Sequence, residues 1–265
     1  MAYADKKHFF DQMITVYGRK PVLEVLRDPA IPVYRLHLAH SNRRDNNIEE
    51  MSTLASQRGI EVHEHSREQL SRISKNKRQD QGVAVDIQCS SHRDYQDFLT
   101  AQNQLADGNA SAIEAPAMQL IALDRITNPQ NLGMIIRSVC ASPMDGLLLP
   151  RDGCASLSAL VIKASAGTLF RCPLLRCDNL NQALTDFSQQ GADIVTLSAD
   201  SKTSLLDYQP SGSVVYVLGN ESDGVSPEVR ALTNTHVSIP MNNDVESLNV
   251  AVTASLIAFR GLLSS

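Results

Sequence analysis

The sequence predicts an α/β protein with two parts. A small N-terminal α/β domain precedes a C-terminal domain, in which a mostly parallel sheet carries helices on both faces. Two observations predict this fold. Short apolar runs alternate with helical patterns along most of the chain, which is typical of parallel strands joined by helices. From about residue 89 to residue 118 the sequence becomes polar and rich in small residues, which is typical of a linker or an excursion at the edge of a domain.

The composition is that of a globular protein. The 265 residues are 43% hydrophobic, enough to fill a core. No apolar run approaches the roughly 20 residues that cross a bilayer, and the first residues are too polar for a signal peptide, so we expect a cytoplasmic protein. The five cysteines are odd in number and lack C-x-x-C spacing, so we expect neither disulfides nor a metal site.

Charge is unevenly distributed along the chain. The net charge of −5 argues against a generally basic nucleic-acid binder. However, residues 1–90 hold 14 Lys and Arg against 12 Asp and Glu, whereas residues 91–265 hold 10 against 17. The front of the chain is therefore the candidate for contact with RNA, although basic clusters alone are more typical of a solvated surface.

The N-terminal domain is predicted to span residues 17–88. Residues 1–16 form an extension without a clear period, expected to be a frayed or docking helix. Behind Pro21 comes a helix, followed by a strand over 33–40, a helix over 48–59 that ends at Gly59, a strand over 60–66, a short helix over 67–75 and a strand over 82–88. Residues 89–118 are the predicted linker.

The C-terminal domain is predicted to span residues 119–265. A buried strand at 120–123 begins it, and helices and strands then alternate as far as the strand at 214–218. Among them are a helix over 134–142, a helix over 156–167 and a short strand over 169–176. A helical pattern closes the chain. In such sheets, ligands bind in the loops that leave the carboxyl ends of strands, so we expect a site there.

Three loops of this domain combine strand-breaking residues with polar side chains. The first is Asn128–Gly133, with Arg137 one helical turn beyond. The second is Leu218–Gly224, and the third runs from Ile239 to Val250. Each of the first two is alone a commonplace turn or helix start. In the third, Ser247 and Asn249 interrupt an apolar helix start and, if buried, would need a ligand or a capping role as partner.

Together, and in this order, the loops closely resemble the SpoU/TrmH branch of the SPOUT RNA 2′-O-ribose methyltransferases. The matching motifs are N-P-x-N-x-G-x-x-x-R at Asn128–Arg137, K-x-S-A-G at Lys163–Gly167, L-G-N-E-x-x-G at Leu218–Gly224, and I-P-M followed by E-S-L-N-V at Ile239–Val250. The front domain resembles the ribosomal-protein-like substrate-binding domain of that family. The chain departs from the family at Ser222-Asp223 and at Asn243, where Gly is common. Asn tolerates a left-handed backbone, so the turn at Asn243 is expected to survive.

The resemblance implies a deep trefoil knot, a homodimer, S-adenosylmethionine as methyl donor, and RNA as substrate, ribosomal more than transfer RNA. The implied cofactor-binding residues are Leu197, Ser198, Leu218, Gly219, Asn220, Gly224, Ile239, Met241 and Leu248. The implied catalytic residues are Arg137, Asn131, Glu221, Ser247 and Asn249. RNA contacts are expected from Arg19, Lys20, Arg43, Arg44, Lys75, Lys77 and Arg78.

The role of Arg137 has two interpretations. Its guanidinium, with a pKa above about 12, is a poor general base, so we prefer a role in gripping a phosphate and stabilising the developing alkoxide; a phosphate-assisted base is the alternative.

Two other classes of function compete. A nucleotide-dependent enzyme such as a dehydrogenase is disfavoured because the G-x-G-x-x-G fingerprint is missing. A non-catalytic RNA-binding protein with a degenerate cofactor loop is the other alternative.

Overall fold

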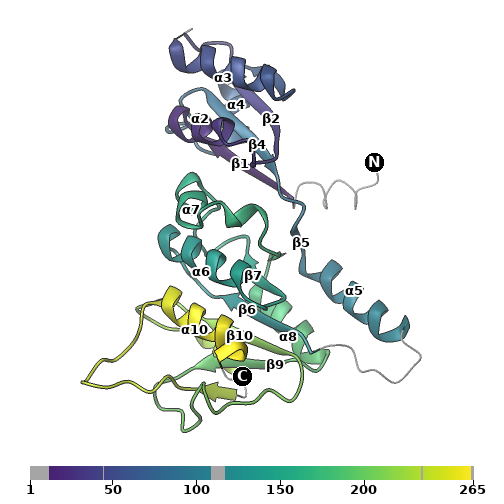
Figure 1. The fold of residues 1–265 in the computed structure, drawn as a ribbon, viewed down its shortest axis with the longest axis vertical. Coiled ribbons are helices and arrows are strands. Elements are labelled where there is room, and N and C mark those ends of the chain that lie inside the picture. The colour runs from purple at the N-terminus through teal and green to yellow at the C-terminus, as the bar shows by residue number, and fades with distance from the viewer. Residues whose placement is uncertain (1–11, 44, 109–116, 234, 264–265) are drawn as a thin grey trace. The chain divides into compact units, whose positions relative to one another are not determined.

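The structure is a computed structural model that describes residues 12–43, 45–108, 117–233 and 235–263. The chain forms two compact units, one up to Ser90 and the other from Ser91 onward, except that Leu157–Ala159 group with the first (Figure 1).

The first unit is a four-stranded sheet with three helices. Its strands are β1 (Met13–Tyr17), β2 (Val33–Ala39), β3 (Glu61–His65) and β4 (Val83–Gln88), in the order β1-β4-β2-β3. The pair β2–β3 is parallel and the other two pairs are antiparallel. The helices are α2 (Arg19–Arg27), α3 (Asn46–Gln57) and α4 (Arg67–Ser74). The helices and strands predicted for residues 17–88 are thereby confirmed.

The predicted helical extension was wrong for its described part. Met13–Tyr17 form β1, which pairs with β4. Ile14 and Val16 are buried and their neighbours are half-buried, so the residues alternate as a strand requires. Residues 1–11, which carry the rest of that prediction, lie outside the described residues.

The second unit contains a seven-stranded sheet in which every neighbouring pair is parallel. Its strands are β5 (His92–Asp94), β6 (Gln119–Leu123), β7 (Gly146–Pro150), β8 (Leu174–Cys177), β9 (Asp193–Leu197), β10 (Val214–Leu218) and β11 (Thr235–Val237), in the order β11-β9-β10-β6-β7-β8-β5. The predicted parallel α/β sheet is confirmed.

Helices cover both faces of this sheet (Figure 1). On one face, α5 (Tyr95–Gly108), α8 (Leu180–Gln189) and α9 (Pro227–Ala231) enclose a core that contains Leu120 and Ala122 of β6. On the other face, α6 (Pro129–Ala141) contacts β7, and α10 (Val250–Leu263) contacts both β10 and α6. Successive side chains of a strand point to opposite faces, which is why the β6 run is apolar throughout.

Most of the predicted linker belongs to the second unit. His92–Asp94 pair with β8 as its edge strand, and α5 follows at once. Phe98 and Leu99 are buried, and the Tyr95 hydroxyl donates to Asp186 Oδ2 at 2.8 Å. This hydrogen bond and the shared apolar core tie the segment to α8. Only the sequence after α5 still has the composition of a linker.

Two shorter elements differ from expectation. The predicted helix over 156–167 is reduced to α7 (Ala159–Ala164), because Ala166 and Gly167 both take positive φ angles and end it. The predicted strand over 169–176 begins only at Leu174, because its first two residues belong to a 3-10 turn over Thr168–Phe170.

Four of the five cysteines are not suited to nucleophilic chemistry. Burial raises the pKa of Cys89 and of Cys177 to about 12, and it raises the pKa of Cys172 and Cys154 as well. A thiol reacts as its thiolate, so these groups are inert at neutral pH. None of the helices in the described ranges has the length and hydropathy that a bilayer crossing requires.

Candidate functional site

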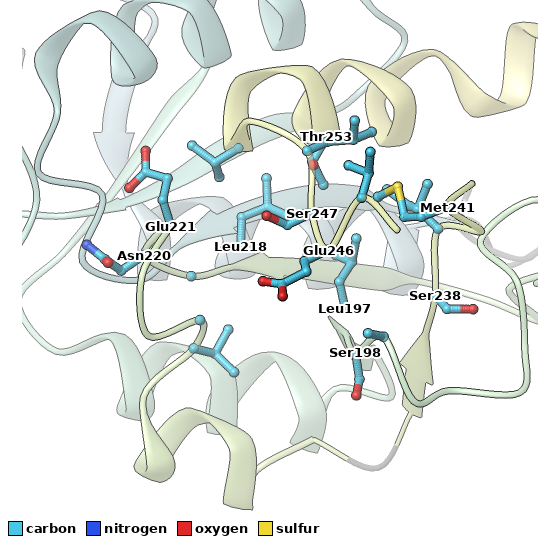
Figure 2. Close-up of a pocket in the computed structure, with 18 of the residues that line it drawn as sticks. Leu197, Ser198, Leu218, Asn220, Glu221, Ser238, Met241, Glu246, Ser247 and Thr253 are labelled. Carbon is cyan, nitrogen blue, oxygen red and sulfur yellow. The ribbon is translucent and has the colours of Figure 1, made fainter. Parts of the chain in front are cut away.

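A cavity of about 500 Å³ opens beside the carboxyl ends of β9 and β10 and against the segment between β11 and α10. Twenty residues line it: Leu197, Ser198, Ala199, Val217, Leu218, Gly219, Asn220, Glu221, Gly224, Val225, Ser238, Ile239, Pro240, Met241, Val245, Glu246, Ser247, Leu248, Val250 and Thr253. In Figure 2, Asn220 and Glu221 lie on one side of it, Met241 and Ser238 on the opposite side, and Leu218 and Leu197 between them.

The cavity collects every residue that the sequence predicted to bind a cofactor. Leu197, Ser198, Leu218, Gly219, Asn220, Gly224, Ile239, Met241 and Leu248 all belong to its lining. They come from the ends of three neighbouring parallel strands, because strands that run the same way end at the same edge of the sheet. Their arrangement therefore follows from the topology as well as from the motifs.

Gly219 lets the second loop fold back on itself. A Cβ added there would lie 2.1 Å from the carbonyl carbon of Gly224 and 2.2 Å from the nitrogen of Val225. The loop closes because the Gly224 amide donates to the Asn220 carbonyl at 2.8 Å, and the Ser222 amide donates to Asn220 Oδ1 at 2.9 Å. Backbone groups thus form this wall of the cavity, and no side chain would fit at position 219.

The third loop contains a left-handed turn. Asn243 and Asp244 have φ angles of 58° and 59°. Asn and Asp take this conformation at a lower cost than most residues. The turn expected at Asn243 is confirmed.

Ser247 and Asn249 are not buried, and one of the two roles expected for them, capping of the helix, is confirmed for Asn249. Both are exposed and precede α10, which begins at Val250. Asn249 has the capping role, since its Oδ1 accepts from the Ala251 amide at 2.9 Å. Ser247 faces the cavity.

A chain of side-chain hydrogen bonds joins the three loops. Asn131, which is only 7% exposed, donates through Nδ2 to Glu221 Oε1 and accepts at Oδ1 from Asn249 Nδ2 at 3.1 Å. One amide therefore links the start of α6 to the second loop and to the third. A buried amide with both its ends satisfied orients its neighbours, and removing it would leave them without partners.

The first loop is the first turn of α6. Asn128 caps the helix by accepting from the amides of Gln130 and Asn131 at 2.8 and 3.3 Å, and Pro129 takes the first helical position. Gly133 then allows α6 to approach α7, since a Cβ there would lie 2.4 Å from that of Ala164. The sequence prediction of a loop followed by a helix placed the helix start at Met134, five residues too late.

Arg137 lies on the exposed side of α6. Its side chain makes no hydrogen bond or ion pair with any residue that the structure describes, and it is absent from the lining of the cavity. Although Arg137 lies one helical turn beyond the first loop, its guanidinium makes no hydrogen bond to that loop. An exposed, unpaired guanidinium on a fixed helix is available to a ligand from outside.

Sequence reasoning missed part of the lining. Glu246 is drawn at the centre of Figure 2, and Val245, Thr253 and Ser238 contribute to the walls. Glu246 was within a recognised motif but received no role. Thr253 lies inside α10, one helical turn beyond Asn249, and that spacing could have identified it.

The basic residues of the first unit gather around one end of its sheet. Arg19 begins α2 and pairs with Asp45 at the start of α3, and its amide donates to Gln81 Oε1 at 3.0 Å. Asn42 Nδ2 donates to the Gly82 carbonyl at 2.7 Å, and Asn76 Nδ2 to the Tyr17 hydroxyl at 3.1 Å. The turn over 75–82 thereby adjoins both helix starts. Exposed on these segments are Lys20, Arg43, Lys75, Lys77 and Arg78, whereas Arg44 lies outside the described residues.

Comparisons with known sequences agree with this arrangement. Residues 118–259 match the SpoU rRNA Methylase family, and residues 15–93 match the family described as RNA 2′-O ribose methyltransferase substrate binding. A tRNA/rRNA methyltransferase of Mycobacterium ulcerans is 36% identical over 93% of this chain and 76% of its own, and one of Mycolicibacterium smegmatis is 37% identical over 93% and 75%.

Solved structures resemble the chain as well. The SpoU methyltransferase AviRb from Streptomyces viridochromogenes, solved in complex with AdoMet, matches with a TM-score of 0.59 at 20% identity and covers 95% of this chain and 90% of its own. A structure concerned with 2′-OH methylation of C/U34 on tRNA matches with a TM-score of 0.50 at 27% identity, over 56% of this chain and 97% of its own.

Proposed function

The chain belongs to the SpoU rRNA methylase family of RNA methyltransferases, and we propose that it transfers a methyl group from S-adenosylmethionine to a ribose 2′-hydroxyl of structured RNA. The proposal depends mainly on one observation: the nine residues implied for the cofactor, from three separate segments, line a single cavity.

The cavity suits a small polar molecule with an apolar part. Its volume of about 500 Å³ lies within the usual range of roughly 300–1,000 Å³ for small-molecule sites. Leucines and Ile239 supply apolar surface, and the backbone exposed at Gly219 supplies hydrogen-bonding groups that a Cβ would cover. When bound, S-adenosylmethionine would supply an activated methyl group on its sulfonium.

The protein's own part in the reaction would be mainly positioning. A sulfonium is already a good leaving group, so orienting the ribose hydroxyl supplies much of the rate. We propose that Arg137 grips the phosphate next to the target and donates to the oxygen as negative charge develops on it. A base role for Arg137 would need assistance from that phosphate, since its pKa exceeds about 12.

Glu221, Asn131 and Asn249 would act as orienting residues. The hydrogen bonds among them fix the start of α6 relative to two walls of the cavity. They therefore also fix the backbone position of Arg137 on that helix. Ser247 lies in the lining, where its hydroxyl can reach a ligand.

We propose ribosomal RNA, read through the basic end of the first unit, as the substrate. The segments that contain Arg19, Lys20, Arg43, Lys75, Lys77 and Arg78 adjoin there, and such groups bind phosphates. The match of residues 15–93 to the substrate-binding family supports recognition of RNA by the first unit. This substrate would be met in the cytoplasm.

We propose a homodimer through the second unit. Met134 of α6 and Val252 and Leu256 of α10 are 42%, 48% and 37% exposed. The two helices pack together, with Ser138 Oγ and Ser255 Oγ 2.8 Å apart, so these apolar side chains belong to neighbouring surfaces. A second copy would cover them. A monomer in light scattering at micromolar concentration would contradict this proposal.

We also propose that the C-terminal segment forms a trefoil knot. From β11, at the edge of the sheet, residues 238–249 lead back to α10, which contacts β10 and α6. A return of this kind is what a knotted C-terminal segment requires.

The central test combines binding and product analysis. The purified protein should bind S-adenosylhomocysteine and not NAD, and ribosomal RNA from cells without the protein should gain one mapped 2′-O-methyl group when S-adenosylmethionine is added. Two parallel reactions serve for comparison: one contains transfer RNA in place of ribosomal RNA, and the other contains S-adenosylmethionine without RNA. NAD binding would favour the dehydrogenase alternative. Binding of RNA without S-adenosylhomocysteine would favour the non-catalytic alternative, and a methylated base would refute 2′-O transfer.

A further inference from the structure

Two consecutive residues hold the second loop of the cavity from behind. Asp124 follows β6 directly and extends its pairing with β10, because the Asp124 amide donates to the Leu218 carbonyl at 2.8 Å. Its residue is only 5% exposed, and Oδ2 accepts from the Ser226 amide at 2.5 Å. A buried carboxylate thus fixes the end of the loop where α9 begins.

Arg125 reaches the same loop at three other points. Its Nη2 donates to the Gly224 carbonyl at 3.1 Å, and its own carbonyl accepts from Asn220 Nδ2 at 3.2 Å. Its Nη1 lies 4.0 Å from Asp223 Oδ2, and its Nε lies 3.5 Å from Asp124 Oδ1. The guanidinium therefore lies between two carboxylates and one backbone carbonyl of the loop.

The backbone of Arg125 is unusual as well. Its φ is 59°, the left-handed region that an arginine seldom adopts. Such a conformation persists only where the surroundings impose it, and here it lets the main chain meet Asn220 while the side chain reaches Gly224. Neither Asp124 nor Arg125 lines the cavity, whereas Asn220, Gly224 and Val225 do.

We propose that Asp124 and Arg125 are positioning residues that hold the loop 219–226 in the shape that binds the methyl donor. This inference rests on the proposed function of the cavity. The pair acts through the loop and touches no ligand. Without it, the loop keeps the internal bonds of Asn220, which close the turn, and the bond from Asn131 to Glu221, which ties it to α6, but no side chain at the end of β6 fixes it. Asp223, at the tip, adds an attraction that draws the loop toward the arginine.

The decisive variant is Arg125→Gly, because glycine accepts the left-handed backbone and removes only the side chain. We expect its thermal unfolding without ligand to stay near that of the wild type or to rise. Its dissociation constant for S-adenosylhomocysteine, measured by titration calorimetry, should increase about tenfold, the effect of losing one or two charge-assisted hydrogen bonds. Arg125→Lys, which keeps the charge, should recover part of that loss.

Two further variants complete the design. Asp124→Asn should weaken S-adenosylhomocysteine binding several-fold, since it removes the charge opposite Arg125 and can turn a donor toward the Ser226 amide. Arg230→Ala is the matched control, because Arg230 is an exposed arginine of α9 whose side chain makes no hydrogen bond or ion pair with the described residues of the loop. The affinity of this variant for S-adenosylhomocysteine should be unchanged.

The outcomes separate this inference from the proposed function. If the wild type binds S-adenosylhomocysteine and Arg125→Gly binds it within twofold, the positioning role is wrong although the cofactor site stands. If the wild type itself fails to bind, the proposed function fails, and the inference with it. An equal loss in Arg230→Ala would also overturn the inference, because the effect would then be one of net charge.

Discussion

The cavity and Arg137 differ in how firmly the protein holds them. The walls of the cavity are fixed by hydrogen bonds between loops, by the close approach at Gly219, and by the buried amide of Asn131. Arg137 extends from the same helix as Asn131 but is bonded to no described residue. The difference suggests that the small ligand meets a prepared site, whereas Arg137 receives its geometry from the RNA. Five predictions test this comparison, from the largest expected effect to the smallest.

Arg137→Ala should distinguish most clearly between the prepared cavity and the exposed Arg137. We expect methyl transfer to fall by about 10²- to 10³-fold, as when a donor that stabilises developing charge is removed. The affinity for S-adenosylhomocysteine and the thermal unfolding should change little, because the side chain bonds to nothing described in the free protein. Single-turnover kinetics and calorimetry measure these quantities, with the exposed Arg171→Ala as control. Near wild-type transfer would contradict the role proposed for Arg137.

Gly219→Ala should impair ligand binding in the prepared cavity. The new methyl group would overlap the backbone of Gly224 and Val225, so the second loop must move. We expect the affinity for S-adenosylhomocysteine to fall by about 30-fold or more, which corresponds to about 2 kcal/mol. Gly212→Ala is a suitable control, since a Cβ there meets nothing within 4 Å. Unchanged binding would show that the second loop is not a wall of the ligand site.

Asn131→Ala should have a moderate effect on both the cavity and methyl transfer. The substitution leaves Glu221 and Asn249 without their shared partner, so we expect the protein to lose about 1–3 kcal/mol of stability. Transfer should fall about tenfold, with a smaller change in S-adenosylhomocysteine affinity. Chemical denaturation and initial rates measure these effects. If only the stability changes, Asn131 supports the fold and does not orient the reacting groups.

Lowering the pH should decrease the stability of the second unit without a specific effect at Arg137. Burial lowers the pKa of His92 to about 4, although its Nε2 bonds to the Leu169 carbonyl at 2.9 Å. Between pH 6.5 and 4 the unfolded chain binds a proton that the folded chain does not, so stability falls as the pH falls. We expect about 1–2 kcal/mol less at pH 5 than at pH 7 from this group. Urea denaturation of His92→Asn should show a weaker dependence on pH.

Asn243→Gly should have the smallest effect. Asn243 already has a φ of 58°, so glycine would take the same backbone at no added strain. We expect less than a twofold change in S-adenosylhomocysteine affinity and a change in stability below about 1 kcal/mol. A large gain in affinity would mean that the Asn243 side chain hinders the ligand.

Sequence patterns predicted the repeating α/β architecture well, because parallel strands are buried on both faces and appear as apolar runs. They also identified the loops of the cavity, where Gly219 and Pro240 mark abrupt ends of strands. The short strand β1 was missed although Ile14 and Val16 alternate, since five residues carry little periodic signal. The edge strand β5 was assigned to a linker because it contains only three polar residues.

What the sequence could not predict is which side chains bond to one another. Asn131 looked like one polar residue of a loop, and only the folded chain brings it to Glu221 and Asn249, which are 90 and 118 positions away. Asp124 and Arg125 follow a predicted strand and received no role, because nothing local indicates that they reach a loop about 100 residues later. Ser247 and Asn249 were expected inside a helix, because propensity cannot tell a capping residue from the first residue of the helix.

The close packing at Gly133 determines how Arg137 can move. Because α6 approaches α7 so closely there, the helix cannot rotate or slide without displacing Val161–Ser165. The Cα of Arg137 is thus stationary while its long side chain exchanges rotamers within picoseconds to nanoseconds. Ordering it on a substrate costs about 2 kcal/mol of conformational entropy, the same for a correct or an incorrect RNA. Discrimination must then arise from whether an RNA presents a phosphate inside the small volume that this side chain samples.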